Sequence, residues 1–116
     1  MVSRFAPLPK PPYYAVTFAA QLSDDRDGYD ETANRMVTSA QSMPGFLGIE
    51  TTRDEQGFGI TISYWESEEA VKNWRDNSEH TLARKNGRNK WYTNYTLRVA
   101  KVERAYEMKN VEIEND

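Results

Sequence analysis

The chain of 116 residues contains no cysteine, and its one histidine is His80. The absence of cysteine excludes disulfide bonds, thiolate nucleophiles and thiolate metal sites. A single histidine leaves only carboxylates as further metal ligands. Asp24, Asp25 and Asp27 lack the rest of a calcium-binding loop, including its final glutamate. The sequence therefore predicts no metal site.

Long apolar runs and an excess of positive charge are also missing. No stretch approaches the ~20 apolar residues of a membrane span, so we expect no membrane association. The net charge of -3 would not attract a phosphate backbone, so we expect no nucleic-acid partner. Arg4 and Lys10 are not followed by the apolar core of a signal peptide, which predicts a cytoplasmic location.

The sequence is rich in aromatic residues, which make up 12% of the chain. This content and the length favour one folded domain with one hydrophobic core. Four prolines between positions 7 and 12 predict an N-terminal extension over residues 1–12, either an ordinary tail or a proline-rich docking ligand. The charged residues 107–116 read as a C-terminal tail, which leaves residues 13–106 for the domain.

The first half of the domain alternates between strand and helix patterns. Residues Tyr13–Gln21 are rich in aromatic and β-branched side chains and predict a strand. Apolar residues then recur at helical spacing and end at Pro44-Gly45; they are Tyr29, Ala33, Met36, Val37 and Ala40. Strands are predicted over Phe46–Arg53 and Phe58–Trp65, joined as a hairpin by the polar turn between them.

Ser67 is a favourable N-cap for a second helix. Asn77-Ser78 can interrupt this helix and recap a second helical segment at about Glu79–Asn86. The last predicted strand, Tyr92–Tyr106, is unusually long.

The resulting order, β-α-β-β-α-β, predicts an α+β, ferredoxin-like fold with a four-stranded antiparallel sheet and both helices on one face. Apolar side chains alternate to both sides of the last strand, with Tyr95, Leu97 and Val99 against Ala100 and Val102. An apolar sheet face without helices is typical of a subunit interface, so we predict a twofold homodimer.

Two segments carry a family resemblance. Residues 43–48 (MPGFLG) and 64–74 (YWESEEAVKNW) resemble the antibiotic biosynthesis monooxygenase family of the dimeric α/β-barrel superfamily. That family shows a PGF-x-G entry into its second strand and a W-x-S-x-E-A-x-x-x-W segment, commonly followed by a histidine, as His80 follows Trp74 here. The resemblance implies homodimers whose sheets form a barrel, with a pocket between sheet and helices in each subunit.

Activities differ within the family. The resemblance implies cofactor-independent oxygenation of a small aromatic or quinol-type substrate, which is our first hypothesis. The alternatives are a non-catalytic, ligand-binding homodimer and a heme-binding or heme-degrading protein. The heme-degrading branch has an asparagine on its first strand, which Tyr13–Gln21 lacks, and a wider spacing between its tryptophan and its histidine.

The candidate catalytic residues are His80 and Arg98. His80 can act as a general base or be an ordinary helix residue. Arg98 lies mid-strand, where it can hold a substrate oxygen or pair with Glu50 or Glu103.

Four further residues are predicted to bind substrate: Phe18, Tyr64, Trp65 and Trp74. The two tryptophans can form an aromatic wall for a flat ligand or pack the core. Trp91, Tyr92 and Tyr95 can line the pocket mouth or the dimer seam, of which we favour the seam.

Overall fold

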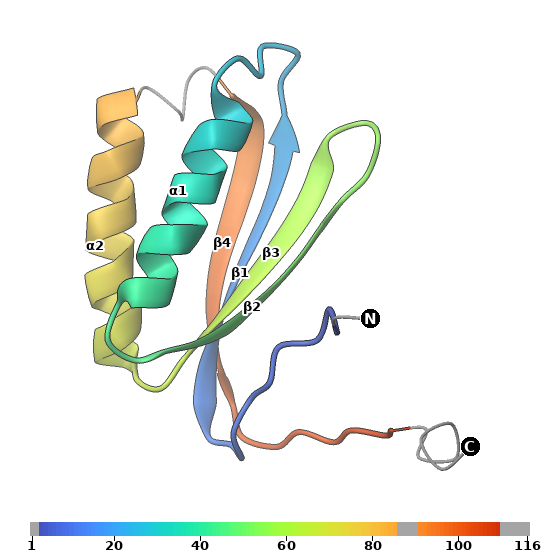
Figure 1. Cartoon of the computed structure of the whole chain (residues 1–116), viewed down its shortest axis with the longest axis vertical. Coiled ribbons are helices and arrows are strands. Elements are labelled where there is room, and N and C mark those ends of the chain that lie inside the picture. The colour runs from blue at the N-terminus through green and yellow to red at the C-terminus, as the bar shows by residue number, and fades with distance from the viewer. Residues whose placement is uncertain (1–2, 86–90, 110–116) are drawn as a thin grey trace.

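The computed structural model describes residues 3–85 and 91–109, with only the backbone described over 78–85. Six elements follow one another along the chain (Figure 1): β1 (Tyr13–Leu22), α1 (Tyr29–Ser42), β2 (Phe46–Arg53), β3 (Phe58–Trp65), α2 (Glu68–Lys85) and β4 (Tyr92–Val102). The predicted order β-α-β-β-α-β is confirmed.

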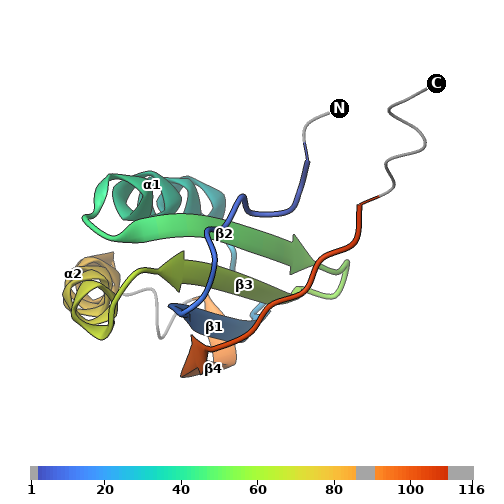
Figure 2. The ribbon, with the colours of Figure 1, turned by 90° about the horizontal axis from the view of Figure 1, so that it is seen from below.

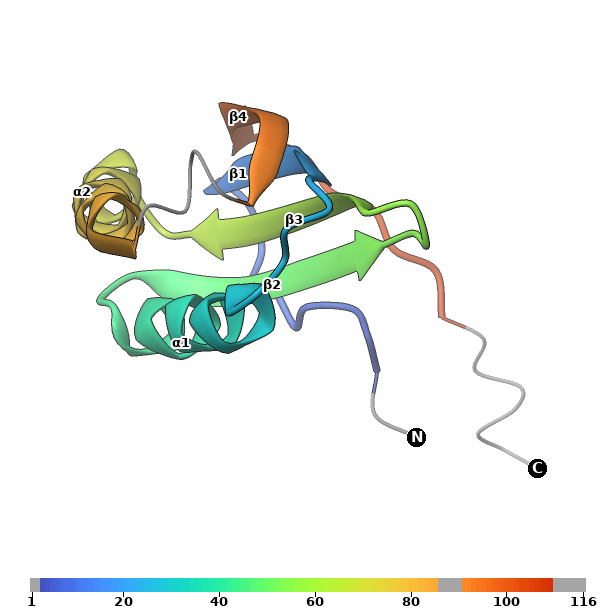
Figure 3. The same cartoon turned by 90° about the horizontal axis from the view of Figure 1, so that it is seen from above.

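The four strands form one antiparallel sheet in the order β2-β3-β1-β4. Val16 in β1 pairs with Ser63 in β3 on one side and Val99 in β4 on the other. Views along the helices show both of them on the same side of the twisted sheet (Figures 2 and 3). The predicted ferredoxin-like fold is therefore confirmed.

Two predicted boundaries were wrong. Helix α2 runs without a break from Glu68 to Lys85, because asparagine and serine within a helix do not end it unless the backbone leaves the helical conformation. Strand β4 ends at Val102, not Tyr106, because Val102 pairs with Tyr13, the first residue of β1, and no partner strand continues beyond it.

Local sequence signals account for the helix starts and the hairpin. The N–H of Ala70 donates to Oγ of Ser67 at 3.1 Å, so Ser67 caps α2 as predicted. Gly28 precedes α1 with φ of 80°, a left-handed conformation that glycine adopts without strain. In the β2–β3 turn, Oδ1 of Asp54 accepts from the N–H of Phe58 at 2.9 Å.

The hydrophobic core lies where the two helices meet the sheet. Its buried residues are Val16, Ala40, Trp65, Ala70 and Val71. Trp65 has no exposed surface, and its indole N–H donates to Oγ of Ser63 at 2.9 Å. The core therefore satisfies the one polar atom that this side chain brings into it.

The other face of the sheet, here called the outer face, is partly covered by the N-terminal segment. The N–H of Ala6 donates to Oε2 of Glu50 at 3.0 Å, and the hydroxyl of Tyr64 donates to Oε1 of the same carboxylate at 2.6 Å. A Cβ on Gly48 would lie 2.8 Å from Cβ of Ala6, so glycine allows this close approach. The segment thus packs on β2.

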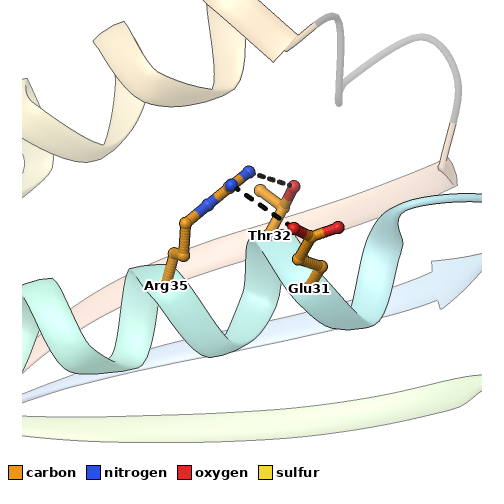
Figure 4. A network of polar contacts seen from close by, with 3 residues as sticks. All are labelled: Glu31, Thr32 and Arg35. Carbon is orange, nitrogen blue, oxygen red and sulfur yellow. Dashed lines mark hydrogen bonds and ion pairs between the residues drawn. The ribbon is translucent and has the colours of Figure 1, made fainter.

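Helix α1 carries a small polar network on its own surface (Figure 4). Arg35 donates through Nη2 to Oγ1 of the buried Thr32 at 3.2 Å, and its Nη1 lies 3.8 Å from Oε1 of Glu31. Both charged side chains are more than half exposed, so the ion pair contributes little to stability. The structural effect of Arg35 is its hydrogen bond to the hydroxyl of Thr32.

Candidate functional site

A cavity of about 600 Å³ lies between the sheet and the helices. All six elements contribute lining residues, and most of these side chains are apolar. The volume lies in the range of small-molecule sites, which are typically apolar with a few polar groups. The cavity is therefore the candidate ligand site of this chain.

Helix α1 lines the cavity with the side of the helix that the sequence pattern singled out. Tyr29, Ala33, Met36, Val37 and Ala40 all face into it. Their recurrence at i, i+4, i+7, i+8 and i+11 places them on one face of the helix. The apolar stripe that directs α1 toward the sheet thus also forms one wall of the cavity.

Phe18, Tyr29, Tyr92 and Tyr95 form an aromatic cluster in the wall of the cavity. The Phe18 ring centroid lies 5.4 Å from that of Tyr92 and 5.2 Å from that of Tyr95. Tyr29 meets Tyr92 edge to face at 5.9 Å. Such edge-to-face arrangements hold the rings in fixed orientations and offer π surface to a flat ligand.

Two stacked tryptophans form a different part of the wall and its support. Trp74 of α2 lines the cavity, and its ring lies 5.8 Å from the Trp65 ring at an interplanar angle of 21°. Trp65 does not line the cavity, since it is fully buried beneath Trp74 and against Phe46. The wall therefore presents Trp74 to a ligand, and Trp65 supports Trp74 from behind.

Few polar atoms face the cavity, and several already have partners. Oγ of Ser63 accepts from the Trp65 indole, and the Thr61 hydroxyl shares a hydrogen bond of 2.8 Å with Thr51. Arg75 adds a cation on the α2 side. Within the described part of the lining there is no carboxylate and no histidine.

Tyr29 also links the aromatic cluster to a cation. Nη2 of Arg53 donates to the Tyr29 hydroxyl at 3.0 Å, and Nη1 donates to the carbonyl of Gly57 at 2.6 Å. Burial raises the pKa of the neighbouring Tyr92 phenol above its ordinary value, and the interaction with Tyr29 raises it further. Tyr92 thus remains protonated and a hydrogen-bond donor well above neutral pH.

The structure brings two of the six predicted site residues to the cavity, namely Phe18 and Trp74. Trp65 lies behind them. The side chain of His80 lies outside the described residues, although its backbone belongs to α2.

Arg98 and Tyr64 lie on the outer face, away from the cavity. Arg98 pairs in register with Thr17, and its guanidinium donates to Oγ1 of Thr96 at 3.2 Å; it forms no ion pair with any residue that the structure describes. Tyr64 binds Glu50 instead of facing the helices, and burial, followed by this hydrogen bond, raises the pKa of its phenol.

Sequence reasoning missed Tyr29 and Arg53, and favoured the dimer seam for Tyr92 and Tyr95. All three tyrosines line the cavity. The alternation of Tyr95 with Leu97 and Val99 could have indicated this, since Leu97 and Val99 face the cavity too. No local signal could have paired Arg53 with Tyr29, because the contact joins the end of β2 to the start of α1.

Two further features of the described residues concern metal sites and membrane spans. Among the side chains of residues 3–77 and 91–109, no three histidine or carboxylate groups gather where they could hold a metal ion. No helix within residues 3–85 and 91–109 is long and apolar enough to cross a membrane.

Comparison with known proteins identifies the family. The model of antibiotic biosynthesis monooxygenases matches residues 12–86. The chain belongs to the antibiotic biosynthesis monooxygenase family. It is also 49% identical over 104 residues to the uncharacterized protein YqjZ of Bacillus subtilis (strain 168), a match that covers 90% of this chain and 91% of that protein.

Solved structures share the fold of this family member. One is SnoaB, a cofactor-independent oxygenase from Streptomyces nogalater, with a TM-score of 0.66, 9% identity and coverage of 82% of this chain and 97% of that one. A protein from Pseudomonas aeruginosa gives a TM-score of 0.64 at 14% identity, covering 84% of this chain and 99% of that one. At these identities the likeness shows the fold alone.

Proposed function

We propose that this family member binds a flat aromatic or quinol-type molecule in its cavity and oxygenates it without a cofactor. The observation that carries the proposal is the cavity of about 600 Å³ with the aromatic cluster in one part of its wall and Trp74 in another. Aromatic rings on two sides suit a flat, apolar ligand. Fold similarity to SnoaB, itself a cofactor-independent oxygenase, supports the choice of reaction.

The proposed reaction uses the substrate's own electrons. A base removes a proton from an electron-rich substrate, and the resulting anion passes one electron to O₂. The two radicals combine to a peroxide anion, which takes the proton back from the base, and loss of water leaves a new carbonyl group. The protein would supply a dry site, a base and donors for the developing oxyanion. His80 remains the proposed base, since no described lining side chain has that role.

Oxygen uptake with anthrone tests this function. We expect wild-type protein to consume O₂ faster than the uncatalysed reaction, and Trp74→Ala to lower the rate at least about tenfold through poorer positioning of the substrate. Glu31→Gln, an exposed change on α1 outside the cavity, is the matched control and should retain the wild-type rate. An equal rate in wild type and Trp74→Ala would contradict the proposed site.

His80→Ala is tested in the same assay, beside the same control. We expect it to lose most of the catalysed rate while anthrone binding is retained, because a general base contributes to the chemical step. Full activity in His80→Ala would remove this residue from the mechanism.

A second candidate function is ligand binding without reaction. It is favoured by the described lining, which lacks a carboxylate or histidine to move a proton. In that case anthrone or a naphthoquinol would raise the melting temperature of the protein without O₂ uptake. The heme alternative depends on His80 as ligand, and a hemin titration that gives the same Soret band in wild type and His80→Ala would exclude that ligation.

We also propose that the chain acts as a cytoplasmic homodimer. The outer face supports this, because Phe58 is 45% exposed there and the outward side of β4 carries no helix. Analytical ultracentrifugation at micromolar concentration should give the mass of two chains. A single-chain mass would contradict the dimer and leave the cavity proposal intact.

A further inference from the structure

We infer that the Arg53–Tyr29–Tyr92 group forms a hydrogen-bond-donating subsite that selects ligands carrying an anionic oxygen, such as a carboxylate, phenolate or enolate, beside their aromatic rings. The inference rests on the proposed function, because it defines which end of a flat ligand the cavity recognises. None of these three residues belongs to the two segments, 43–48 and 64–74, that carry the family resemblance.

The first observation is a cation without a carboxylate. Arg53 is half-buried on the cavity side of β2, where Gly59 on β3 leaves the space for its guanidinium. Its hydrogen bonds go to the Gly57 carbonyl and the Tyr29 hydroxyl, and it forms no ion pair with any carboxylate in the described chain. The positive charge is therefore only partly compensated by neutral oxygens.

The second observation is the direction of the hydrogen bonds. A guanidinium can only donate, so the Tyr29 oxygen must accept from Arg53 and keep its own proton to give elsewhere. Tyr92 interacts with this phenol, and at most one of the two hydroxyl protons can serve between them. At least one proton remains, and no acceptor for it is found among the described residues.

The third observation is where this group lies. Tyr29 and Tyr92 both line the cavity, and their rings meet edge to face at 5.9 Å, so both side chains belong to its wall. The guanidinium also lies 5.5 Å from the Tyr29 ring centroid, which fixes the phenol from a second direction. The charge of Arg53 polarises the phenol that it donates to, which strengthens the outgoing hydrogen bond to an electron-rich acceptor.

A ligand would satisfy this subsite by placing an acceptor oxygen against the tyrosine hydroxyls and its rings along the aromatic cluster. An anionic oxygen gains most, since it accepts a charge-assisted hydrogen bond close to a cation that is only partly compensated. A neutral carbonyl would bind less tightly. In the proposed oxygenation, the same donor would stabilise the enolate formed when the substrate loses its proton.

The test compares 2-naphthoate with 2-naphthamide, two flat probes of similar shape that differ in charge, by titration calorimetry. We expect wild type to bind the naphthoate at least about tenfold more tightly. Arg53→Met and Tyr29→Phe should each reduce this preference to less than about threefold while naphthamide affinity stays near the wild-type value. Loss of structure alone would weaken both probes together, and Arg53→Lys should restore part of the preference because it restores the charge.

Arg75→Met is the comparison variant, because Arg75 is a second cation, which lines the cavity from α2. We expect it to keep the preference for naphthoate. A preference for naphthoate that survives Arg53→Met but disappears in Arg75→Met would overturn the inference. It would assign binding of the carboxylate to Arg75 on α2. Equal binding of both probes by wild type would overturn the inference and leave the aromatic cavity in place. Binding of neither probe would overturn the cavity proposal as well.

Discussion

Trp65 and Trp74 separate a structural role from a ligand-binding role, although their rings stack on each other. Trp65 has no exposed surface, whereas Trp74 is half-buried and lines the cavity. Replacing each by phenylalanine makes the same chemical change in two environments. We expect Trp65→Phe to destabilise the fold strongly, and Trp74→Phe to act mainly on ligand binding.

The magnitude for Trp65→Phe follows from three losses. The smaller ring leaves a void of about 40 Å³, which costs about 1 kcal/mol at about 24 cal/mol per Å³. Removal of the buried ring atoms costs roughly another 1 kcal/mol of transfer free energy. The hydrogen bond from the indole to Ser63 is also lost, at about 1 kcal/mol. The free energy of unfolding should fall by about 2–3 kcal/mol, or roughly 10 °C in melting temperature.

Urea unfolding followed by far-ultraviolet circular dichroism measures this effect without depending on tryptophan emission. Both variants and wild type are compared at one protein concentration, because a homodimer would make stability depend on concentration. Trp74→Phe should cost less than about 1 kcal/mol, since part of that ring is already in solvent. A cost below about 0.5 kcal/mol for Trp65→Phe, or equal costs for both variants, would refute the packing argument.

Two further predictions concern a turn and a buried phenol. Gly45→Ala should destabilise by about 2 kcal/mol or more, because Gly45 has φ of 86° and a new Cβ would lie 2.6 Å from Cβ of Ala70 in α2; a melting temperature equal to that of wild type would contradict this. Burial raises the pKa of Tyr92 in the folded state above its unfolded value near 10, so its contribution is complete below pH 10 and is lost as the pH rises further. The free energy of unfolding of Tyr92→Phe should therefore fall less steeply above pH 10 than that of wild type. The same change at the exposed Tyr106 should leave the wild-type slope of stability against pH. Parallel slopes for Tyr92→Phe and wild type would contradict the raised pKa.

Local patterns predicted the elements well, and the reason is their short range. The bounds of β2 and β3 agree with the prediction because a polar turn with Gly57 joins two strands within the same stretch of sequence. The predicted break in α2 was wrong because residues 77–78 favour a cap only when the chain leaves the helix, and that choice depends on what the helix packs against.

The candidate site was less predictable, because alternation along a strand does not reveal which face the helices cover. In β3 the strongly apolar set includes Phe58, Ile60 and Ile62, together with Tyr64, and an apolar set is usually expected to face the core. In the structure, Thr61 and Ser63 face the cavity, and Trp65 on the same side of the strand packs into the core. The apolar set lies on the outer face. The sequence-based hypothesis placed Tyr64 and Trp74 in one ligand site, although the two lie on opposite faces of the sheet.

The apolar residues of β3 also make the outer face a candidate interface. An apolar set that points away from both helices needs cover, and the N-terminal segment supplies it only at the β2 side, through Ala6 and its hydrogen bond to Glu50. Strand β2 is one edge of the sheet and β4 is the other, and the contacts of Ala6 lie at β2. Arg98 lies on β4, at the opposite edge. Its predicted role near a substrate would therefore require a second chain, whereas the recognition proposed for Arg53 and Tyr29 is complete within one.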